Sequence, residues 1–292
     1  MAKSSRKAHR VKSVPLNTRL TDYAAKVFPI LGSRTAVKKA IAAGTLLLND
    51  ALTEEGALVK KGDVLILKIR AAKKPKIAIN VPIIFEDDYL IVVNKPAGIA
   101  VNGNRNKTVE NALIGVVKKG KVADALTKPV AVHRIDVPTK GLVLLAKTKS
   151  ALIQLSKAFQ QNQVKKTYWA VVHGQPKPKG RINQALQGKS AITDYETIKV
   201  VSSRIFKQLA LVKLAPITGR THQLRIHLKD IGHLIVGDKQ YAGHTKTILG
   251  KGLFLAACQL IFTHPITNET MDIGIEPPSR FQKLLEREEK RF

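Results

Sequence analysis

An apolar run preceded by a turn constrains the fold of this chain more than any other segment. Leu142 to Ala146 contains only apolar residues, most of them branched, which predicts a short buried strand. The preceding residues 138–141, Pro-Thr-Lys-Gly, predict a tight turn into that strand. Asp136 stands just before the turn, where neither strand nor turn propensity requires an acid. It is therefore either scaffold, capping the turn or pairing with Arg134, or a group that does chemistry.

Four short motifs follow one another along the chain. They are Asn94-Lys95-Pro96-Ala97-Gly98, the segment 133–147 beginning His-Arg-Ile-Asp, the segment 164–172 with Lys-Thr-Tyr at 166–168, and TGRTHQLRIH at 218–227, followed by Gly237-Asp238 and Tyr241. In this order they resemble motifs of the RluA-type pseudouridine synthases, enzymes that convert uridine to pseudouridine in RNA. The resemblance covers roughly residues 85–265. It favours the chemical interpretation of Asp136.

The resemblance implies a catalytic set of three residues. Asp136 would be the catalytic carboxylate, with Arg225 beside it, because a neighbouring arginine favours the ionised form that a dry pocket disfavours. Arg220 is a second candidate for that ion pair, and sequence spacing does not choose between the two. Tyr168 would offer a flat face to the base and a hydroxyl for proton removal from carbon 5; from residue type alone, it would be a core residue.

Two further basic residues flank the predicted catalytic acid. Arg134 is two positions from Asp136, so in an extended segment both side chains face the same way. The resemblance suggests that Arg134 fills the space left by a flipped base, and a plain phosphate contact is the alternative. Lys140 departs from the family motif, where a Ser is usual, and would add a cation near Asp136. Other departures are Leu234 and Ala256.

Charge indicates a polyanionic partner. The chain has 50 Lys and Arg against 21 Asp and Glu, a formal net charge of +29, which favours RNA binding. No run of about 18 apolar residues and no signal-peptide pattern points to a membrane. Cys258 stands alone within an apolar run, which predicts a buried thiol. No ligand spacing indicates a metal, and no glycine pattern indicates a nucleotide; we therefore expect no cofactor.

Composition divides the chain into four parts. Residues 1–14 are rich in Lys and Arg and predict a flexible basic arm, with an organelle transit peptide as the alternative. Residues 15–70 predict a small α/β domain. Residues 71–80 lack a core pattern and predict a linker. Residues 81–292 form the catalytic domain, for which an α+β fold with a mainly antiparallel mixed sheet is expected.

A basic helix distinguishes the small N-terminal domain. Ser33 predicts a helix start, and Val37 and Ile41 lie on its buried face. Its other face carries Arg34, Lys38 and Lys39, which predicts RNA binding; a solvated helix without a partner is the alternative. The order of elements, with strands at 45–48 and 64–69, resembles the S-four-type RNA-binding domain.

In the catalytic domain, branched residues predict five short strands. These are Leu90 to Val93, Val143 to Ala146, Tyr168 to Val172, Leu209 to Leu214, and Leu224 to His227. Helices are expected at Thr108 to Val117 and at Ser150 to Gln161, with Ser150 as the cap of the second.

Two classes of function remain. The first is a cytoplasmic, monomeric pseudouridine synthase that isomerises uridines in structured RNA. Large-subunit rRNA is the expected substrate, because a basic accessory domain commonly accompanies rRNA modifiers in the family the chain resembles, and tRNA is the alternative. The second is a catalytically idle RNA-binding or ribosome-assembly factor that keeps the same groove. The set of Asp136, Tyr168 and Arg225 favours the enzyme.

Overall fold

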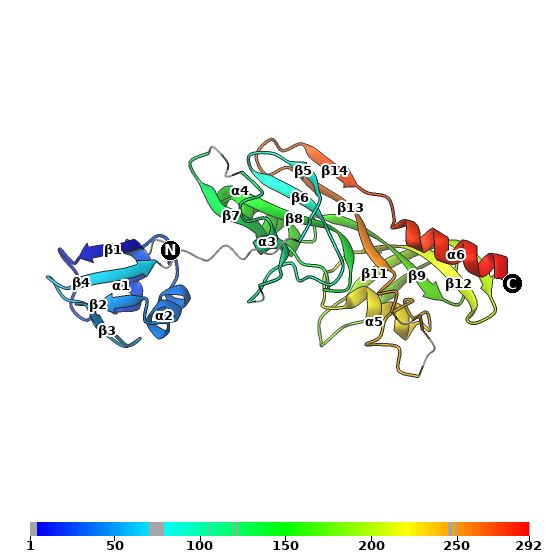
Figure 1. Cartoon of the computed structure of the whole chain (residues 1–292), viewed down its shortest axis with the longest axis horizontal. Helices are drawn as coiled ribbons and strands as arrows, with labels where there is room; N and C mark the ends of the chain where they lie inside the picture. Colours follow the sequence, from blue (N-terminus) through cyan, green and yellow to red (C-terminus); the bar gives the residue numbers. More distant parts are fainter. Residues whose placement is uncertain are drawn as a thin grey trace. The chain divides into compact units, whose positions relative to one another are not determined.

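The computed structural model describes residues 5–69, 79–104, 106–118, 120, 122–244, 247–248 and 250–291 (Figure 1). The chain divides into two compact units, Met1–Lys74 and Pro75–Phe292. This boundary falls within the predicted linker at 71–80, most of which lies outside the described residues. No helix of the described ranges is both long and apolar enough to cross a membrane.

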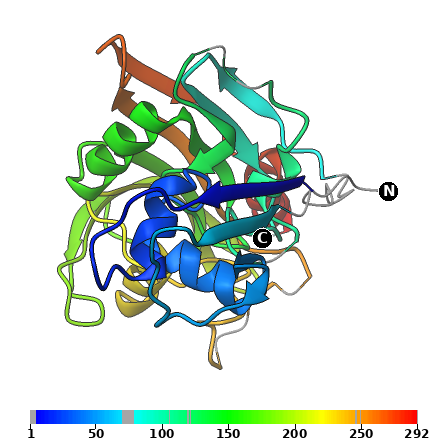
Figure 2. The same ribbon diagram turned by 90° about the vertical axis from the view of Figure 1, so that its left-hand side faces the viewer.

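The first unit is a four-stranded antiparallel sheet with two helices against one face (Figures 1 and 2). Its elements are β1 (Ser5–Arg10), α1 (Leu20–Val27), α2 (Arg34–Ala42), β2 (Leu46–Leu48), β3 (Ala51–Leu52) and β4 (Val64–Ile69), in the sheet order β1-β4-β2-β3. Helix α2 begins as predicted, because the Ser33 hydroxyl accepts a hydrogen bond from the Ala36 amide at 3.2 Å. Val37 and Ile41 face the core.

The prediction of a flexible arm over residues 1–14 is wrong for residues 5–11. Residues 5–10 form β1 and pair along their whole length with β4. Val11 is buried, and the His9 ring contacts the Tyr23 hydroxyl at 3.1 Å. The physical reason is alternation: His9 and Val11 share one face of the extended segment and pack on the core, while Arg6 and Arg10 project from the other face and are exposed. The high density of Lys and Arg in residues 1–14 conceals this pattern.

The second unit is built around a large mixed sheet with the order β10-β11-β12-β9-β13-β8-β6-β5. Strands β7 and β14 pair with β8 and β13, and among the strand pairs of the described residues only β8 and β13 run parallel. The α+β prediction is confirmed. The strands are β5 (Ile83–Glu86), β6 (Leu90–Lys95), β7 (Ala125–Ala131), β8 (Lys140–Thr148), β9 (Lys165–His173), β10 (Lys179–Asn183), β11 (Ile192–Ser203), β12 (Lys207–Pro216), β13 (Leu255–Thr263) and β14 (Thr270–Gly274).

Helices α5 (Gln223–Asp230) and α6 (Ser279–Arg291) lie on opposite faces of this sheet (Figure 1). On β9, Val172 belongs to the same core cluster as Leu228 of α5, whereas Val171 packs in the cluster of Leu285 on α6. Alternation along β9 therefore separates two cores. Tyr168 takes part in the α5 side, at the centre of the sheet between β12 and β13.

Three expected elements differ from the structure. The segment 224–227, predicted as a strand, belongs to α5, because Leu224 and Leu228 are one helical turn apart on the core face and buried polar residues between them disguise the period. The helix predicted at 108–117 is shorter, with α3 spanning Val109–Ala112. Helix α4 (Lys149–Gln160) is capped by Thr148, whose hydroxyl accepts from the Ala151 amide at 3.1 Å, and not by Ser150.

Candidate active site

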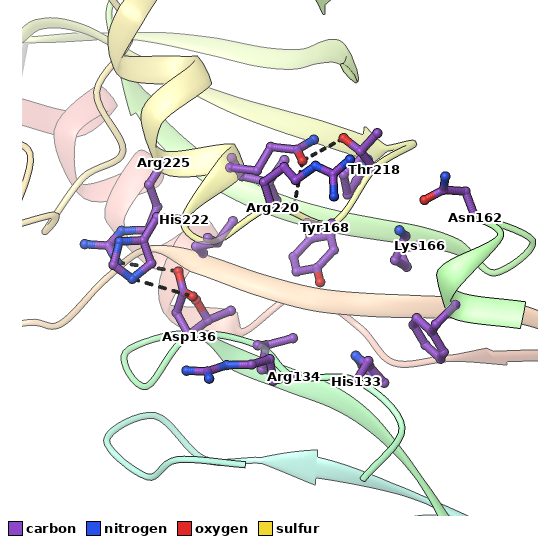
Figure 3. A pocket seen from close by; sticks show the side chains of 18 of the residues that line it. His133, Arg134, Asp136, Asn162, Lys166, Tyr168, Thr218, Arg220, His222 and Arg225 are labelled. Atoms are coloured by element: carbon purple, nitrogen blue, oxygen red, sulfur yellow. Dashed lines mark hydrogen bonds and ion pairs between the residues drawn. The ribbon is translucent and has the colours of Figure 1, made fainter. Parts of the chain in front are cut away.

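A cavity of about 470 Å³ opens where the loop before β8, strand β9 and the start of α5 meet (Figure 3). All three residues of the predicted catalytic set line it: Asp136, Tyr168 and Arg225. Asp136 and Arg225 are 89 residues apart in the sequence, and the three residues come from a loop, strand β9 and helix α5. The fold thus brings together what the motifs left separate.

Asp136 lies in the loop between β7 and β8, with its side chain 20% exposed. Its Oδ2 is 3.5 Å from Nη1 of Arg225, and its Oδ1 is 3.8 Å from Nε2 of His222. Gly141 anchors the loop against β13: at φ of +124°, a Cβ there would lie 2.1 Å from the Ala257 carbonyl oxygen. The predicted contact between Asp136 and Arg225 is confirmed, whereas His222 was not expected.

Arg225 is bound mainly by a residue to which no role was assigned. Its Nε and Nη2 donate to the two carboxylate oxygens of Asp238 at 2.7 and 2.8 Å, and Nη2 also donates to Gln240 at 3.0 Å. Arg225 is 4% exposed and Asp238 is 0% exposed. Burial alone would lower the pKa of Arg225, but Asp238 and, less strongly, Asp136 raise it above its usual value. The guanidinium is therefore a fixed, permanent cation beside Asp136.

Several polar side chains of the segment 218–227 form buried hydrogen bonds. The Gln223 side chain accepts from the Thr218 hydroxyl at 2.7 Å and the Arg220 amide at 3.0 Å, and donates to the Thr193 hydroxyl at 3.0 Å. The His227 ring lies 3.0 Å from the same Thr193 hydroxyl. These bonds hold the first turn of α5, which carries Arg225, against β11.

Lys95, the lysine of the Asn94–Gly98 motif, is a second buried cation near the carboxylate. Its Nζ donates to the carbonyls of Pro96, Ile99 and Val137 at 3.1, 2.9 and 3.1 Å. Three acceptors match the three N–H groups of an ammonium. Burial lowers the pKa of Lys95 to about 8, and the charge of Asp136 opposes the shift. Lys95 thus ties down the residue that follows Asp136, and sequence reasoning assigned it no role.

Tyr168 stays protonated. Burial raises the pKa of its hydroxyl, and the nearby charge of Asp136 adds to the effect. A neutral phenol can donate a hydrogen bond but is a poor acceptor of a proton. The raised pKa therefore favours the expected platform for a base over the expected role in removing the proton from carbon 5.

Of the three remaining cations predicted near Asp136, two line the cavity and one does not. Arg134 and Arg220 line the cavity and are exposed, and Nε of Arg220 donates to the Ser190 carbonyl at 3.0 Å rather than to Asp136. Lys140 does not line the cavity; its charge acts on the Cys258 thiol. Lys140 is the first residue of β8, and no ion pair or hydrogen bond of the described residues joins it to Asp136, so the extra cation near Asp136 stays a prediction.

The basic residues of α2 are exposed, as predicted, but two of them are paired. Arg34 contacts Asp22, and Nζ of Lys38 lies 2.6 Å from Glu55. Lys39 is exposed.

Cys258 is buried as expected. Within the described part of the chain, no group of His, Cys, Asp or Glu side chains is arranged to hold a metal ion.

Comparison with known proteins identifies a family. A sequence profile described as RNA pseudouridylate synthase matches residues 89–230. The chain is 30% identical over 305 residues to a ribosomal large subunit pseudouridine synthase C of Rickettsia bellii, with 92% of this chain and 98% of the relative covered. It is 35% identical over 207 residues to the dual-specificity RNA pseudouridine synthase RluA of Haemophilus influenzae, with 65% and 90% covered.

A solved structure agrees with the fold. The human RNA pseudouridylate synthase domain containing 4 is 27% identical and superimposes with a TM-score of 0.56, covering 70% of this chain and 92% of that one. The family profile spans the elements from β6 to α5, which position the cavity and its three predicted residues. The chain therefore belongs to the RluA-type RNA pseudouridine synthases, isomerases that act on RNA.

Proposed function

We propose that this chain isomerises uridines of structured RNA with Asp136 as its catalytic carboxylate. One observation carries the proposal: the carboxylate is partly buried in the cavity, next to the anchored guanidinium of Arg225, and close enough to Tyr168 for its charge to raise the pKa of the phenol. A carboxylate, a fixed cation and an aromatic ring then face one space. That combination suits a reaction at the bond between a sugar and a flat base.

The reaction needs no second reactant. The N1–C1′ bond of uridine breaks and its electron pair stays on the uracil ring; the ring turns, C5 bonds to C1′, C5 gives up its proton, and N1 gains one. Hydrolytic glycosidases use two carboxylates, because a water must also be activated. Here no water has to be activated, so a single carboxylate suffices. Among the described residues that line the cavity, Asp136 is the only one with a carboxylate.

The target base must leave its stack to reach the cavity. Extruding a nucleotide costs a few kcal/mol, and stacking on an aromatic side chain returns about 1–3 kcal/mol. Tyr168 supplies the ring. Arg134 lines the cavity and is exposed, which supports the proposal that it contacts the RNA where the base has left; a phosphate contact is the simpler alternative.

For the RNA substrate, we propose large-subunit ribosomal RNA. The support is the name of the Rickettsia bellii relative, which is matched over 98% of its length. The first unit, with its exposed Arg34, Lys38 and Lys39 on α2, is proposed to be an S-four-type RNA-binding domain. The RluA relative is described as dual-specificity, so tRNA is the second candidate substrate.

The test replaces Asp136 by Asn, which keeps the size of the side chain and removes its charge. Pseudouridine formation in ribosomal RNA, read by chemical mapping, should fall below detection, while RNA affinity stays within about twofold. Wild-type activity in Asp136→Asn would reject the catalytic assignment. A wild-type protein that binds RNA and forms no pseudouridine in rRNA or tRNA would instead favour the idle RNA-binding factor.

A further inference from the structure

Lys166 is a cavity lysine that the assignments above leave unused. It lies two residues before Tyr168 on β9, so both side chains project from the same face of the strand. Lys166 lines the cavity and is half-buried. Among the described residues, no hydrogen bond or ion pair satisfies its ammonium group. A partly desolvated cation without a counter-charge is costly, unless a ligand supplies the anion.

The neighbour of Lys166 does not supply that anion. His133 stacks on Phe159 at 4.4 Å between ring centroids, and its Nε2 accepts from the Leu144 amide at 2.9 Å. Burial, and then the charge of Lys166, lowers the pKa of His133 to about 3, so the imidazole is neutral at physiological pH. Burial also lowers the pKa of Lys166 itself. Neither the neutral His133 ring nor the Phe159 ring stacked on it therefore supplies a negative charge to Lys166.

The position of Lys166 relative to Asp136 suggests what it contacts. In Figure 3, the Tyr168 ring lies between Asp136 on one side and Lys166 on the other. If the proposed function holds, C1′ of the target uridine sits at Asp136 and the base stacks on Tyr168. The outer edge of the pyrimidine, with a carbonyl group, then points toward the ammonium.

We propose that Lys166 donates a hydrogen bond to a carbonyl oxygen of the target uracil and stabilises the charge that the ring carries once the glycosidic bond has broken. When the N1–C1′ bond breaks, its electron pair stays on uracil and spreads over N1 and the two carbonyl oxygens. The ammonium faces one of these oxygens and transfers no proton. When C5 has bonded to C1′, C5 has lost its proton and N1 has gained one, the ring is neutral again. The contact is thus strongest while the base is detached, which accelerates the reaction.

A phosphate of a neighbouring nucleotide is a less suitable ligand for this lysine. Asn162, which lies beside Lys166 in Figure 3, lines the cavity and directly follows the C-terminal cap of α4. The carbonyl end of a helix carries partial negative charge and disfavours a phosphate. A detached uracil spreads its smaller charge over several atoms and presents N–H as well as oxygen.

The experiment combines side-chain and substrate changes. Single-turnover rate constants at saturating RNA are measured for wild type, Lys166→Met and Lys165→Met, on RNA carrying uridine, 2-thiouridine or 4-thiouridine at the target position. Lys165 is the matched control, because it is exposed and adjacent on β9 but projects from the other face. Lys166→Met should lower the rate constant by on the order of 100-fold with RNA affinity little changed, and Lys165→Met by less than about twofold.

The sulfur substitutions identify the contact. Sulfur is a weak hydrogen-bond acceptor, so one of the two thio-substrates should slow wild type, and the same substitution should slow Lys166→Met much less. Because this ratio compares one protein on two substrates, partial misfolding of the variant cancels. Equal thio-effects in both proteins, or weaker RNA binding with an unchanged rate constant, would overturn the role of Lys166. Either result leaves the test of Asp136 unaffected, since Asp136 is intact in every protein used.

Discussion

Two regions of this molecule bring basic and acidic side chains together with opposite physical results. At the cavity, Arg225 is 4% exposed and its carboxylate partner Asp238 is fully buried, with contacts of 2.7 and 2.8 Å. On α2, Lys38 lies 2.6 Å from Glu55, but both side chains are about half exposed, at 52% and 51%. The distances are similar. Exposure to water differs by an order of magnitude.

Burial, and not distance, decides what each pair does. In a low-dielectric interior, separating two charges is expensive, so Arg225 keeps one position and can orient Asp136. In water the same contact is screened and contributes little, so Lys38 is not held at Glu55, and under the proposed function it exchanges Glu55 for an RNA phosphate. Under the proposed function, the buried cations serve the geometry of the reaction and the exposed ones bind RNA.

Among the changes that test this comparison, the largest effect is expected from Asp238→Asn. It leaves the buried guanidinium of Arg225 with one strong acceptor fewer, and breaking a buried pair costs about 3–5 kcal/mol. Because the guanidinium that faces Asp136 then loses its fixed position, pseudouridine formation should also fall, by about 100-fold, which corresponds to about 2.7 kcal/mol of activation free energy. Thermal melting and single-turnover rates, the latter taken well below the melting temperature, check both parts.

The matched control is Asp194→Asn. Asp194 binds Arg181 with the same two-point geometry, at 2.6 and 2.9 Å, but on an exposed part of the sheet. Melting temperature and activity should stay close to wild type. Similar losses in both variants would contradict the importance of burial.

A pH dependence should follow from Lys95. Its ammonium loses its proton as the pH rises through about 8. The neutral amine donates one hydrogen bond fewer to the loop and no longer places a positive charge near Asp136. Activity should therefore fall between pH 7 and 9. Stability should move the other way. Its folded pKa lies below the usual value of 10.5, so the unfolded chain binds more protons between these values and the free energy of unfolding rises with pH across that window.

Lys95→Met removes the group that titrates. Its activity should be lower throughout, and the decline between pH 7 and 9 should flatten, as measured by single-turnover rates across that range. A decline of unchanged steepness in Lys95→Met would assign the titration to another group.

The smallest effect on the reaction itself is expected on α2. Replacing Arg34, Lys38 and Lys39 by Gln should weaken RNA binding and reduce the slope of log affinity against log salt by roughly 2, because fewer counterions are released. The rate at saturating RNA should be unchanged. Filter binding at several salt concentrations measures the slope.

Lys179 and Lys199 provide the control for α2. Both are exposed and paired with Glu196 and Glu289 on the second unit. Their replacement by Gln should alter the salt slope less than the changes on α2. If both sets of substitutions changed the salt slope equally, α2 would be only part of a general positive surface.

Local patterns predicted much of this fold because local physics governs it. The strand that follows Gly141, the helix capped by Ser33 and the central strand with Tyr168 all form where branched residues, a cap and alternation place them. Helix α5 was missed for the opposite reason. Its polar residues are buried and bonded to distant parts of the chain, so its amphipathic period is hidden.

For the site, motif resemblance named Asp136, Tyr168 and Arg225, and the cavity contains all three. It assigned no role to Asp238, Lys95 or Lys166, although each stands inside or beside a motif. What these residues do depends on which atoms they face after folding, and spacing along the chain does not carry that information.

Net charge, the order of motifs and the local elements are properties of the chain alone, since they depend on residue type and on neighbours a few positions away. Three properties arise only on folding: the pairing of Arg225 with Asp238, the neutral state of His133 and the lowered pKa of Lys95. Each depends on removing water from a charged or polar group and replacing it with atoms distant in sequence, and that exchange has no local signature.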